Sequence, residues 1–197
     1  MITTVLFDLD GVIRHFDPEV ATRAEQRHGL AAGVIGRTAF DGSLIGGVVA
    51  GQMSRAEWVE RIGDAIGSGD AAREWASQQG RIDPALPALA EELAGRGLRT
   101  AILTNGTDTI PAEVAALGLT GMFAPIFNTA DLGYAKPDPR AFALVLDALG
   151  CAAQSVFFTD DSAGNVAAAA ALGFPAHVFD GVEGLRAALR DHGIDVG

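Results

Sequence analysis

Two aspartates follow the first apolar run of the chain. Residues 5–7 are typical of a buried strand, and Asp8-Leu9-Asp10-Gly11 comes directly after them. Residues two apart along an extended segment fall on the same side, so we expect Asp8 and Asp10 to face one site. Because a buried carboxylate needs compensation, other parts of the chain must supply positive charge or hydrogen bonds. Such a pair can bind a metal ion, act as a nucleophile or exchange protons.

Three further polar groups are candidate partners for these carboxylates. Thr104-Asn105 ends a second predicted strand, Asp160-Asp161 ends another, and Lys136 lies in a loop before a predicted helix. Lys136 is the only lysine of the chain, whereas arginine occurs 13 times. A compact ammonium group among carboxylates indicates a phosphate or metal site.

The carboxyl ends of parallel strands meet at one edge of a sheet, where ligands bind. Asp8, Thr104 and Asp160 are all predicted at such ends. The hard oxygens of Asp8, Asp160 and Asp161 suit Mg²⁺, and no cluster of histidines or cysteines suggests zinc. Lys136 would add a point charge that attracts a phosphoryl group.

The same residues can perform chemistry at phosphorus. A carboxylate can attack a phosphoryl group, so Asp8 is the candidate nucleophile of an aspartyl-phosphate mechanism. Asp10 is the candidate acid that protonates the leaving oxygen and the base that later activates water. The Thr104 hydroxyl, the Asn105 amide and the backbone amides after Asp8 are expected to hold the phosphoryl oxygens.

The composition predicts a globular protein with one main core. The chain has 197 residues, of which 49% are hydrophobic and 20% are charged, which allows one main domain and a smaller module. Its net charge of −11 opposes binding to nucleic acids and to anionic membrane surfaces. We therefore expect a small phosphorylated metabolite as the partner of a monomer or homodimer.

Other features of the sequence favour the cytoplasm. Cys151 is the only cysteine, so an intrachain disulfide bond is excluded and a reducing compartment is expected. Asp8 interrupts the first apolar run, which therefore does not resemble a secretion signal. Apolar stretches remain far shorter than the roughly 20 residues that span a bilayer. We expect a cytoplasmic protein with no membrane partner.

From residue 99 onward, predicted strands alternate with helices, which is typical of a parallel sheet covered by helices. The predicted strands cover residues 3–7, 100–103, 125–128, 155–159 and 176–179. Asp83-Pro84 predicts the start of a helix that ends near Gly95 or Gly97. Asp138-Pro139 predicts the start of another, which ends at Gly150.

Residues 14–82 show helical periodicity and no strand-like runs. Ser54 and Glu57 have the spacing of a capping box at the start of a helix, and Asp70 predicts the start of another. Residues 36–51 are rich in glycine and allow no assignment. Trp58 and Trp75 are expected in the core of these helices rather than as platforms for a sugar. The predicted fold class is thus α/β, with a helical insert after the first strand.

In their order along the chain, the polar groups resemble the four motifs of the haloacid dehalogenase-like superfamily. These motifs are Asp8-Leu9-Asp10-Gly11-Val12, Thr104-Asn105, Lys136-Pro137-Asp138 and Asp160-Asp161-Ser162. The resemblance implies a Rossmann-like core, residues 1–13 and 83–197, and a helical cap, residues 14–82. The cap resembles that of the subfamily with β-phosphoglucomutase, the L-2-haloacid dehalogenases and bacterial sugar-phosphate phosphatases. Residues 133–137 and 157–165 look closest to its glucose-1-phosphate phosphatase-like branch.

The resemblance also implies roles for the motif residues. Asp8 is implied as nucleophile and metal ligand, and Asp10 as acid and base with its backbone carbonyl on the metal. Thr104 is implied as a phosphate ligand and Lys136 as a charge neutraliser. One or both of residues 160 and 161 would complete the metal sphere.

The resemblance also separates members of the superfamily. Haloacid dehalogenases lack the second aspartate, so Asp10 favours phosphoryl chemistry. Phosphonoacetaldehyde hydrolases use a cap lysine, which this chain does not have.

One departure concerns the residues after the first motif. Many relatives carry an acidic residue there, whereas this chain has Ile13-Arg14-His15. Arg14 and His15 lie where the cap or the substrate mouth begins, so they are candidate substrate contacts together with Asn105 and Gly106.

We therefore expect a Mg²⁺-dependent phosphatase that hydrolyses a small phosphorylated metabolite, such as a sugar phosphate, through an aspartyl-phosphate at Asp8. A phosphomutase of the β-phosphoglucomutase type is the first alternative, because the sequence does not separate transfer to water from transfer to a sugar. A non-catalytic metabolite-binding protein is the second alternative. The intact cluster of carboxylates disfavours it, since a site without turnover has no need to hold repelling charges together.

Overall fold

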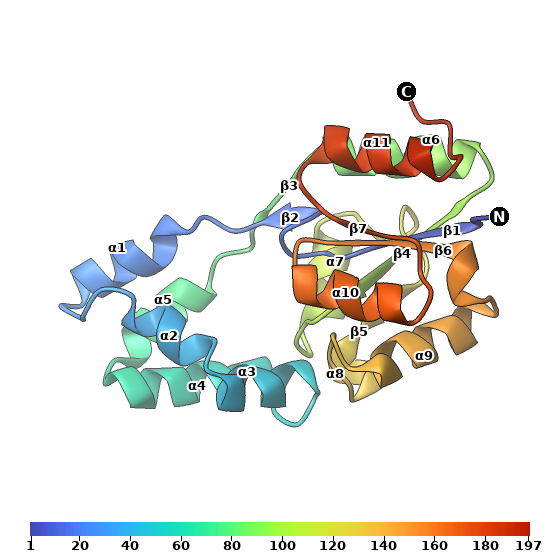
Figure 1. The fold of residues 1–197 in the computed structure, drawn as a ribbon. Coiled ribbons are helices and arrows are strands. Elements are labelled where there is room, and N and C mark those ends of the chain that lie inside the picture. Colours follow the sequence, from blue (N-terminus) through green and yellow to red (C-terminus); the bar gives the residue numbers. More distant parts are fainter.

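The structure is a computed structural model that describes all 197 residues. Its larger lobe contains a five-stranded sheet in which all neighbouring strands are parallel (Figure 1). The strands are ordered β5 (Ile126–Asn128), β4 (Arg99–Thr104), β1 (Thr4–Phe7), β6 (Val156–Asp160) and β7 (Ala176–Val178). The five predicted strands are confirmed, and their ends differ from the prediction by at most one residue.

The central strand determines where the polar groups meet. β1 lies between β4 and β6, with Phe7 in register with Ile102 on one side and Thr159 on the other. The residues that follow this level of the sheet are Asp8, Thr104 and Asp160. Parallel pairing therefore places all three at the same edge of the sheet.

Both faces of the sheet are buried under helices (Figure 1). Along β1, Val5 and Phe7 belong to the hydrophobic cluster on one face, and Leu6 belongs to the cluster on the other. The first face is covered by α6 (Ala85–Gly95), α7 (Ile110–Ala116) and α11 (Val182–Asp191). The second face is covered by α9 (Pro139–Leu149) and α10 (Ala163–Ala171). Burial on both faces explains the continuous apolar runs of these strands.

Two of the helices begin where the aspartate–proline pairs predict. Asp138 accepts a hydrogen bond from the Arg140 N–H at 2.9 Å at the start of α9. Asp83 accepts one from the Ala85 N–H at 2.9 Å at the start of α6. Gly150 ends α9 with a φ of +66°, a left-handed conformation that glycine adopts without strain.

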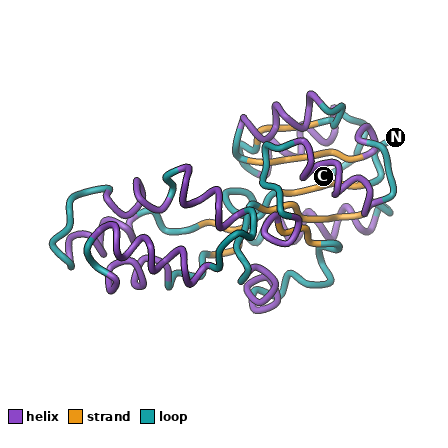
Figure 2. The backbone as a smooth tube through the Cα atoms, turned by 90° about the horizontal axis from the view of Figure 1, so that it is seen from below, coloured by secondary structure: helices purple, strands orange, loops and turns teal.

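The smaller lobe consists mainly of helices, as the tube in Figure 2 shows. Its helices are α1 (Glu19–Arg27), α2 (Val34–Ala39), α3 (Gly42–Val49), α4 (Arg55–Ile66) and α5 (Gly69–Ala76). Ser54 and Glu57 form both hydrogen bonds of the predicted capping box before α4. The prediction for Asp70 is wrong, because the Ser68 side chain caps α5 and Asp70 instead pairs with Arg73 at 2.7 Å. Helices α2 and α3 occupy the glycine-rich stretch that the sequence left unassigned.

The two lobes are connected by a pair of short antiparallel strands. They are β2 (Arg14–His15) and β3 (Arg81–Ile82). The small lobe also rests directly on the large one. The Arg55 N–H donates to Asp108 Oδ1 at 2.7 Å, and a Cβ added to Gly51 would lie only 2.1 Å from the carbonyl oxygen of Ala130. The division at residues 13/14 and 82/83 stays a prediction. No helix combines the length and apolar character needed to cross a bilayer.

Candidate active site

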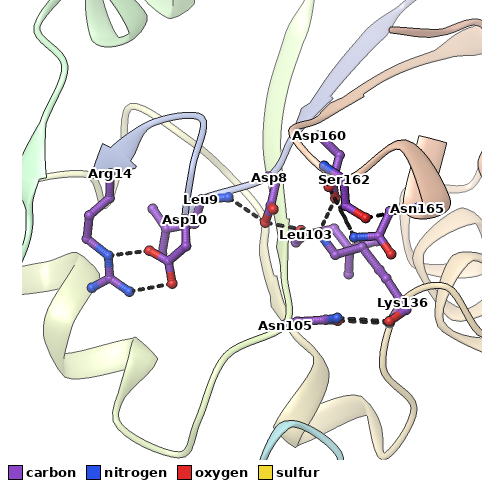
Figure 3. Close-up of polar contacts among 10 residues, drawn as sticks. All are labelled: Asp8, Leu9, Asp10, Arg14, Leu103, Asn105, Lys136, Asp160, Ser162 and Asn165. Atoms are coloured by element: carbon purple, nitrogen blue, oxygen red, sulfur yellow. Dashed lines mark hydrogen bonds and ion pairs between the residues drawn. The ribbon is translucent and has the colours of Figure 1, made fainter. Parts of the chain in front are cut away.

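The ammonium group of Lys136 lies at the centre of a buried polar cluster (Figure 3). Its Nζ atom lies 2.9 Å from Asp8 Oδ1 and 2.6 Å from Asp160 Oδ2. It also donates to the carbonyl oxygen of Leu103 at 2.8 Å. The Lys136 side chain is fully buried, and its ammonium group makes two hydrogen bonds and an ion pair with Asp8 inside the protein. The structure therefore brings the only lysine of the chain between two of the predicted carboxylates.

Asp160 is held by donors on both of its oxygens. Oδ1 accepts from the Ser162 N–H at 2.8 Å, and Asn165 Nδ2 lies 3.1 Å from both oxygens. Ser162 caps α10, so the first turn of this helix directs both donors toward the carboxylate. Asp160 is therefore fixed in place and anchors Lys136 beside Asp8.

Burial shifts the ionisation of this cluster. Burial raises the pKa of the Asp8 carboxyl to about 7; Lys136 opposes this rise and Asp160 adds to it. Burial lowers the pKa of the Lys136 ammonium, but Asp8 and Asp160 together raise it by more, so the net pKa lies above its ordinary value. Burial, and then the neighbouring Asp160, raise the pKa of Asp161. A cation bound among these carboxylates would favour their ionised forms.

Asn105 positions Lys136 through its peptide group. Asn105 Nδ2 donates to the Lys136 carbonyl oxygen at 2.9 Å, and the Lys136 N–H donates to Asn105 Oδ1 at 2.8 Å. The Asn105 side chain therefore uses its oxygen and one hydrogen bond of its NH₂ group on the Lys136 peptide, and its role toward phosphate stays a prediction. Thr104 is buried at the end of β4, as predicted. The backbone at Gly106 packs so closely on α7 that a Cβ there would lie 2.3 Å from Ile110 Cγ1.

Gly11 allows Asp161 to approach the first motif. Gly11 has a φ of +93°, and a Cβ added to it would lie 2.2 Å from Asp161 Oδ2. Any other residue would be strained at this φ and would push the Asp161 carboxylate away. The turn after β1 is thus shaped to leave room for the third carboxylate.

Three carboxylates form a group that fits a divalent cation. Oxygens of Asp8, Asp160 and Asp161 all lie within 4.8 Å of one another. Asp161 is largely exposed and its carboxylate receives no hydrogen bond from another residue, while the one hydrogen bond and the ion pair of Asp8 both fall on Oδ1. Two of the three residues thus offer oxygens that are not engaged by protein donors. An all-carboxylate donor set suits Mg²⁺.

Asp10 is paired with Arg14 rather than with Lys136 (Figure 3). Arg14 donates two hydrogen bonds to the Asp10 carboxylate, from Nε to Oδ1 at 2.5 Å and from Nη2 to Oδ2 at 3.0 Å. Arg14 Nη1 also donates to Glu113 Oε2 at 2.6 Å. The strand ends at Phe7, so the alternation of an extended chain no longer applies at Asp10. The predicted role of its backbone carbonyl stays a prediction.

A cavity of about 340 Å³ lies between the two lobes, next to the polar cluster. Asp10, Arg14, Asn105 and Gly106 line it, whereas Asp8, Lys136, Asp160 and Asp161 do not. Of the predicted substrate contacts, His15 is the exception, because it does not line the cavity; its ring nitrogen lies 3.1 Å from the Val12 carbonyl oxygen. This volume suits a small molecule.

Sequence reasoning missed several residues of the site. Asn165 and Glu113 were not proposed, although both bind a predicted site residue. Asn165 follows Asp160 by five residues, within the first turn of a capped helix, so its position could have suggested a contact. Glu113 is 99 residues from Arg14, and nothing in the sequence connects them.

The fold and the motifs together define the class of protein. Residues 2–173 match the haloacid dehalogenase-like hydrolase family, and the chain belongs to this family of hydrolases. The match covers the predicted motifs and most of the predicted core, and it confirms the resemblance seen in the sequence.

Relatives of known function span most of the chain. The protein is 32% identical to Phosphatase MT3486 of Mycobacterium tuberculosis, covering 91% of this chain and 88% of that protein. It is 30% identical to the phosphoglycolate phosphatase of Rhodospirillum rubrum, covering 89% of this chain and 78% of that protein. Its fold matches that of a haloacid dehalogenase family enzyme from Bacteroides thetaiotaomicron in complex with magnesium and inorganic phosphate. That match has a TM-score of 0.75 and 23% identity, and covers 90% of this chain and 93% of the other.

Proposed function

We propose that this protein is a Mg²⁺-dependent phosphatase that hydrolyses a small phosphorylated metabolite through an aspartyl-phosphate at Asp8. The observation that carries the proposal is the cluster of Asp8, Asp160 and Asp161, whose oxygens lie within 4.8 Å of one another beside the buried Lys136 ammonium. A carboxylate and a phosphoryl group repel each other, so the attack requires nearby positive charge that offsets this repulsion. The phosphatases among the relatives support the same reaction class.

Different residues of the cluster bind the phosphoryl group and orient the nucleophile. Lys136 offsets negative charge in the site and holds Asp8 through Oδ1. Asp160, fixed by Ser162 and Asn165, keeps Lys136 in position. Bound Mg²⁺, held by Asp8, Asp160 and Asp161, would offset charge on the phosphoryl oxygens.

The reaction proceeds in two displacements. In the first, the Asp8 carboxylate forms a bond to phosphorus while the bond from phosphorus to the leaving oxygen breaks, and Asp10 gives that oxygen a proton. In the second, water attacks phosphorus, Asp10 takes a proton from the water, and the bond from phosphorus to Asp8 breaks. Inorganic phosphate leaves, and both aspartates return to their first state. Because Asp10 lines the cavity, it faces the place where the leaving group would lie. It must release Arg14 in order to exchange protons.

The test is phosphate release from a panel of phosphorylated metabolites by the purified protein, with Mg²⁺ and with a chelator. We expect release that requires Mg²⁺ and is lost in Asp8→Asn. The matched control is Asp147→Asn, an exposed aspartate on α9, which should retain full activity. Undiminished turnover by Asp8→Asn would contradict the nucleophile. Conversion of one sugar phosphate into another without free phosphate would instead identify a phosphomutase.

A further inference from the structure

The wall that the small lobe gives to the cavity is mostly apolar. Phe16, Phe40, Ile45, Val49, Trp58 and Trp75 all line it. These side chains come from the β2–α1 connection and from the helical lobe, whereas the large lobe lines the cavity with residues from the loops after β1 and β4 and from α7. The part of a substrate that lies beyond the phosphoryl group would therefore contact hydrophobic side chains.

Three aromatic rings form the centre of this wall. Phe40, Trp58 and Trp75 pack edge to face, with centroids 5.5 to 6.5 Å apart. Trp58 and Trp75 also belong to the hydrophobic cluster of the helical lobe, as the sequence predicted. Phe40 differs from them because it is 64% exposed although it lines a cavity. A large apolar side chain left open in this way can pack against a further ring, since aromatic groups extend such clusters readily.

Most polar side chains around the cavity are already engaged with other protein groups. Asp10 and Glu113 bind Arg14, and the Asn105 amide binds the Lys136 peptide. The Thr107 and Thr109 hydroxyls lie 2.8 Å apart and share a hydrogen bond, and Asp17 binds Arg23 at 2.6 Å. A polyhydroxylated ligand would find few free partners among them, and unpaired hydroxyl groups in an apolar pocket are costly.

Two polar side chains that line the cavity, Arg55 and Gln78, have hydrogen-bonding groups without a protein partner. Arg55 gives one guanidinium hydrogen bond to the Ala76 carbonyl oxygen and has no carboxylate partner. Gln78 lines the same cavity, and its buried Oε1 has no hydrogen-bond partner. Arg55 begins α4, and Gln78 lies between α5 and β3, so both belong to the small lobe. They provide room for one polar substituent on an otherwise apolar group.

We propose that this cavity selects phosphate monoesters whose leaving group is flat and apolar, such as an aromatic ring, over esters of sugars and other polyols. The inference rests on the proposed phosphatase activity and adds the substrate class, which revises the sugar phosphate expected from the sequence. Phe40 is the specificity-determining residue, because it presents its ring to the cavity and takes no part in the chemistry at phosphorus.

The test compares three alkyl esters whose leaving groups differ in shape and polarity: ethyl phosphate, glycerol phosphate and phenethyl phosphate. We expect kcat/KM for phenethyl phosphate to exceed that for the other two by about tenfold or more. Phe40→Ala should lower this value about fivefold and leave ethyl phosphate within about twofold. The matched control is Leu144→Ala, which truncates another exposed apolar side chain, on α9 and outside the cavity. It should change none of the three values.

A direct binding measurement separates this inference from the proposed function. The only two tryptophans of the chain, Trp58 and Trp75, both line the cavity, so intrinsic fluorescence reports its occupancy. Phenethylphosphonate should change the fluorescence with saturation, and Phe40→Ala should raise its Kd about fivefold. If none of the three esters is hydrolysed but this binding is seen, the phosphatase proposal fails and the apolar specificity stands. Glycerol phosphate as the better substrate, or an equal loss for all esters in Phe40→Ala, would overturn the inference.

Discussion

Replacing Lys136 with methionine tests the buried polar cluster most severely. Methionine has a similar length but removes the charge, the ion pair with Asp8, and two hydrogen bonds, to Asp160 and Leu103. Breaking a buried ion pair by removing one partner costs about 3–5 kcal/mol, because the remaining charge is left uncompensated. The loss should not exceed this range, since Asp160 keeps its donors from Ser162 and Asn165 and Asp8 can take up a proton.

The free energy of unfolding in urea, measured with a chelator present, is the appropriate assay. Lys136→Met should lose about 3–5 kcal/mol with an unchanged dependence on urea concentration. The control is Arg61→Met, an exposed cation without an ion pair, which should change the stability by less than about 0.5 kcal/mol. In a double-mutant cycle with Asp160→Asn, the two losses should not add, because both variants break the same pair. A loss below about 1 kcal/mol in Lys136→Met would refute the reasoning.

Three further predictions concern the turn, the metal and the C-terminus. Gly11→Ala should lower Tm and weaken Mg²⁺ binding in calorimetry, because its Cβ would lie 2.2 Å from the Asp161 carboxylate; equal Mg²⁺ affinity would contradict the close approach. Mg²⁺ should raise the Tm of the wild-type protein but hardly that of Asp161→Asn, whereas equal shifts would remove Asp161 from the metal site. The Gly197 N–H and Arg186 lower the pKa of Glu92 to about 2, so the ionised carboxylate stabilises the fold above pH 4.5 and this gain disappears as the pH falls toward 2. The Tm difference between wild type and Glu92→Gln should therefore shrink over that range, and a constant difference would contradict the pairing.

The sheet was predictable from local sequence, because each strand is an apolar run that both faces bury. The ends of these strands then placed Asp8, Thr104 and Asp160 at one edge without further information. The single lysine gave a second independent signal, since a residue type used once is informative about its site. These parts of the site follow from periodicity, pairing direction and charge.

The rest depends on contacts that local patterns do not encode. The pairing of Asp10 with Arg14 arises beyond the end of the strand whose alternation we used, so that pattern could not predict it. Most of residues 36–51 lie in helices α2 and α3 although their glycines weaken helical propensity, because packing against neighbouring helices compensates. The aromatic wall of the cavity combines Phe40, Trp58 and Trp75 from separate segments, so it becomes visible only in the folded chain.

The covalent step at Asp8 can be measured directly. The protein would be mixed with Mg²⁺ and an ester that it hydrolyses, and the reaction would be quenched in acid. Borohydride would then reduce any acyl phosphate to the corresponding alcohol, and the digested protein would be analysed by mass spectrometry. The account predicts modification of Asp8 alone, formed at least as fast as turnover and absent in Asp8→Asn. Turnover at the full rate with no modification of Asp8, or with the modification on another carboxylate, would contradict it.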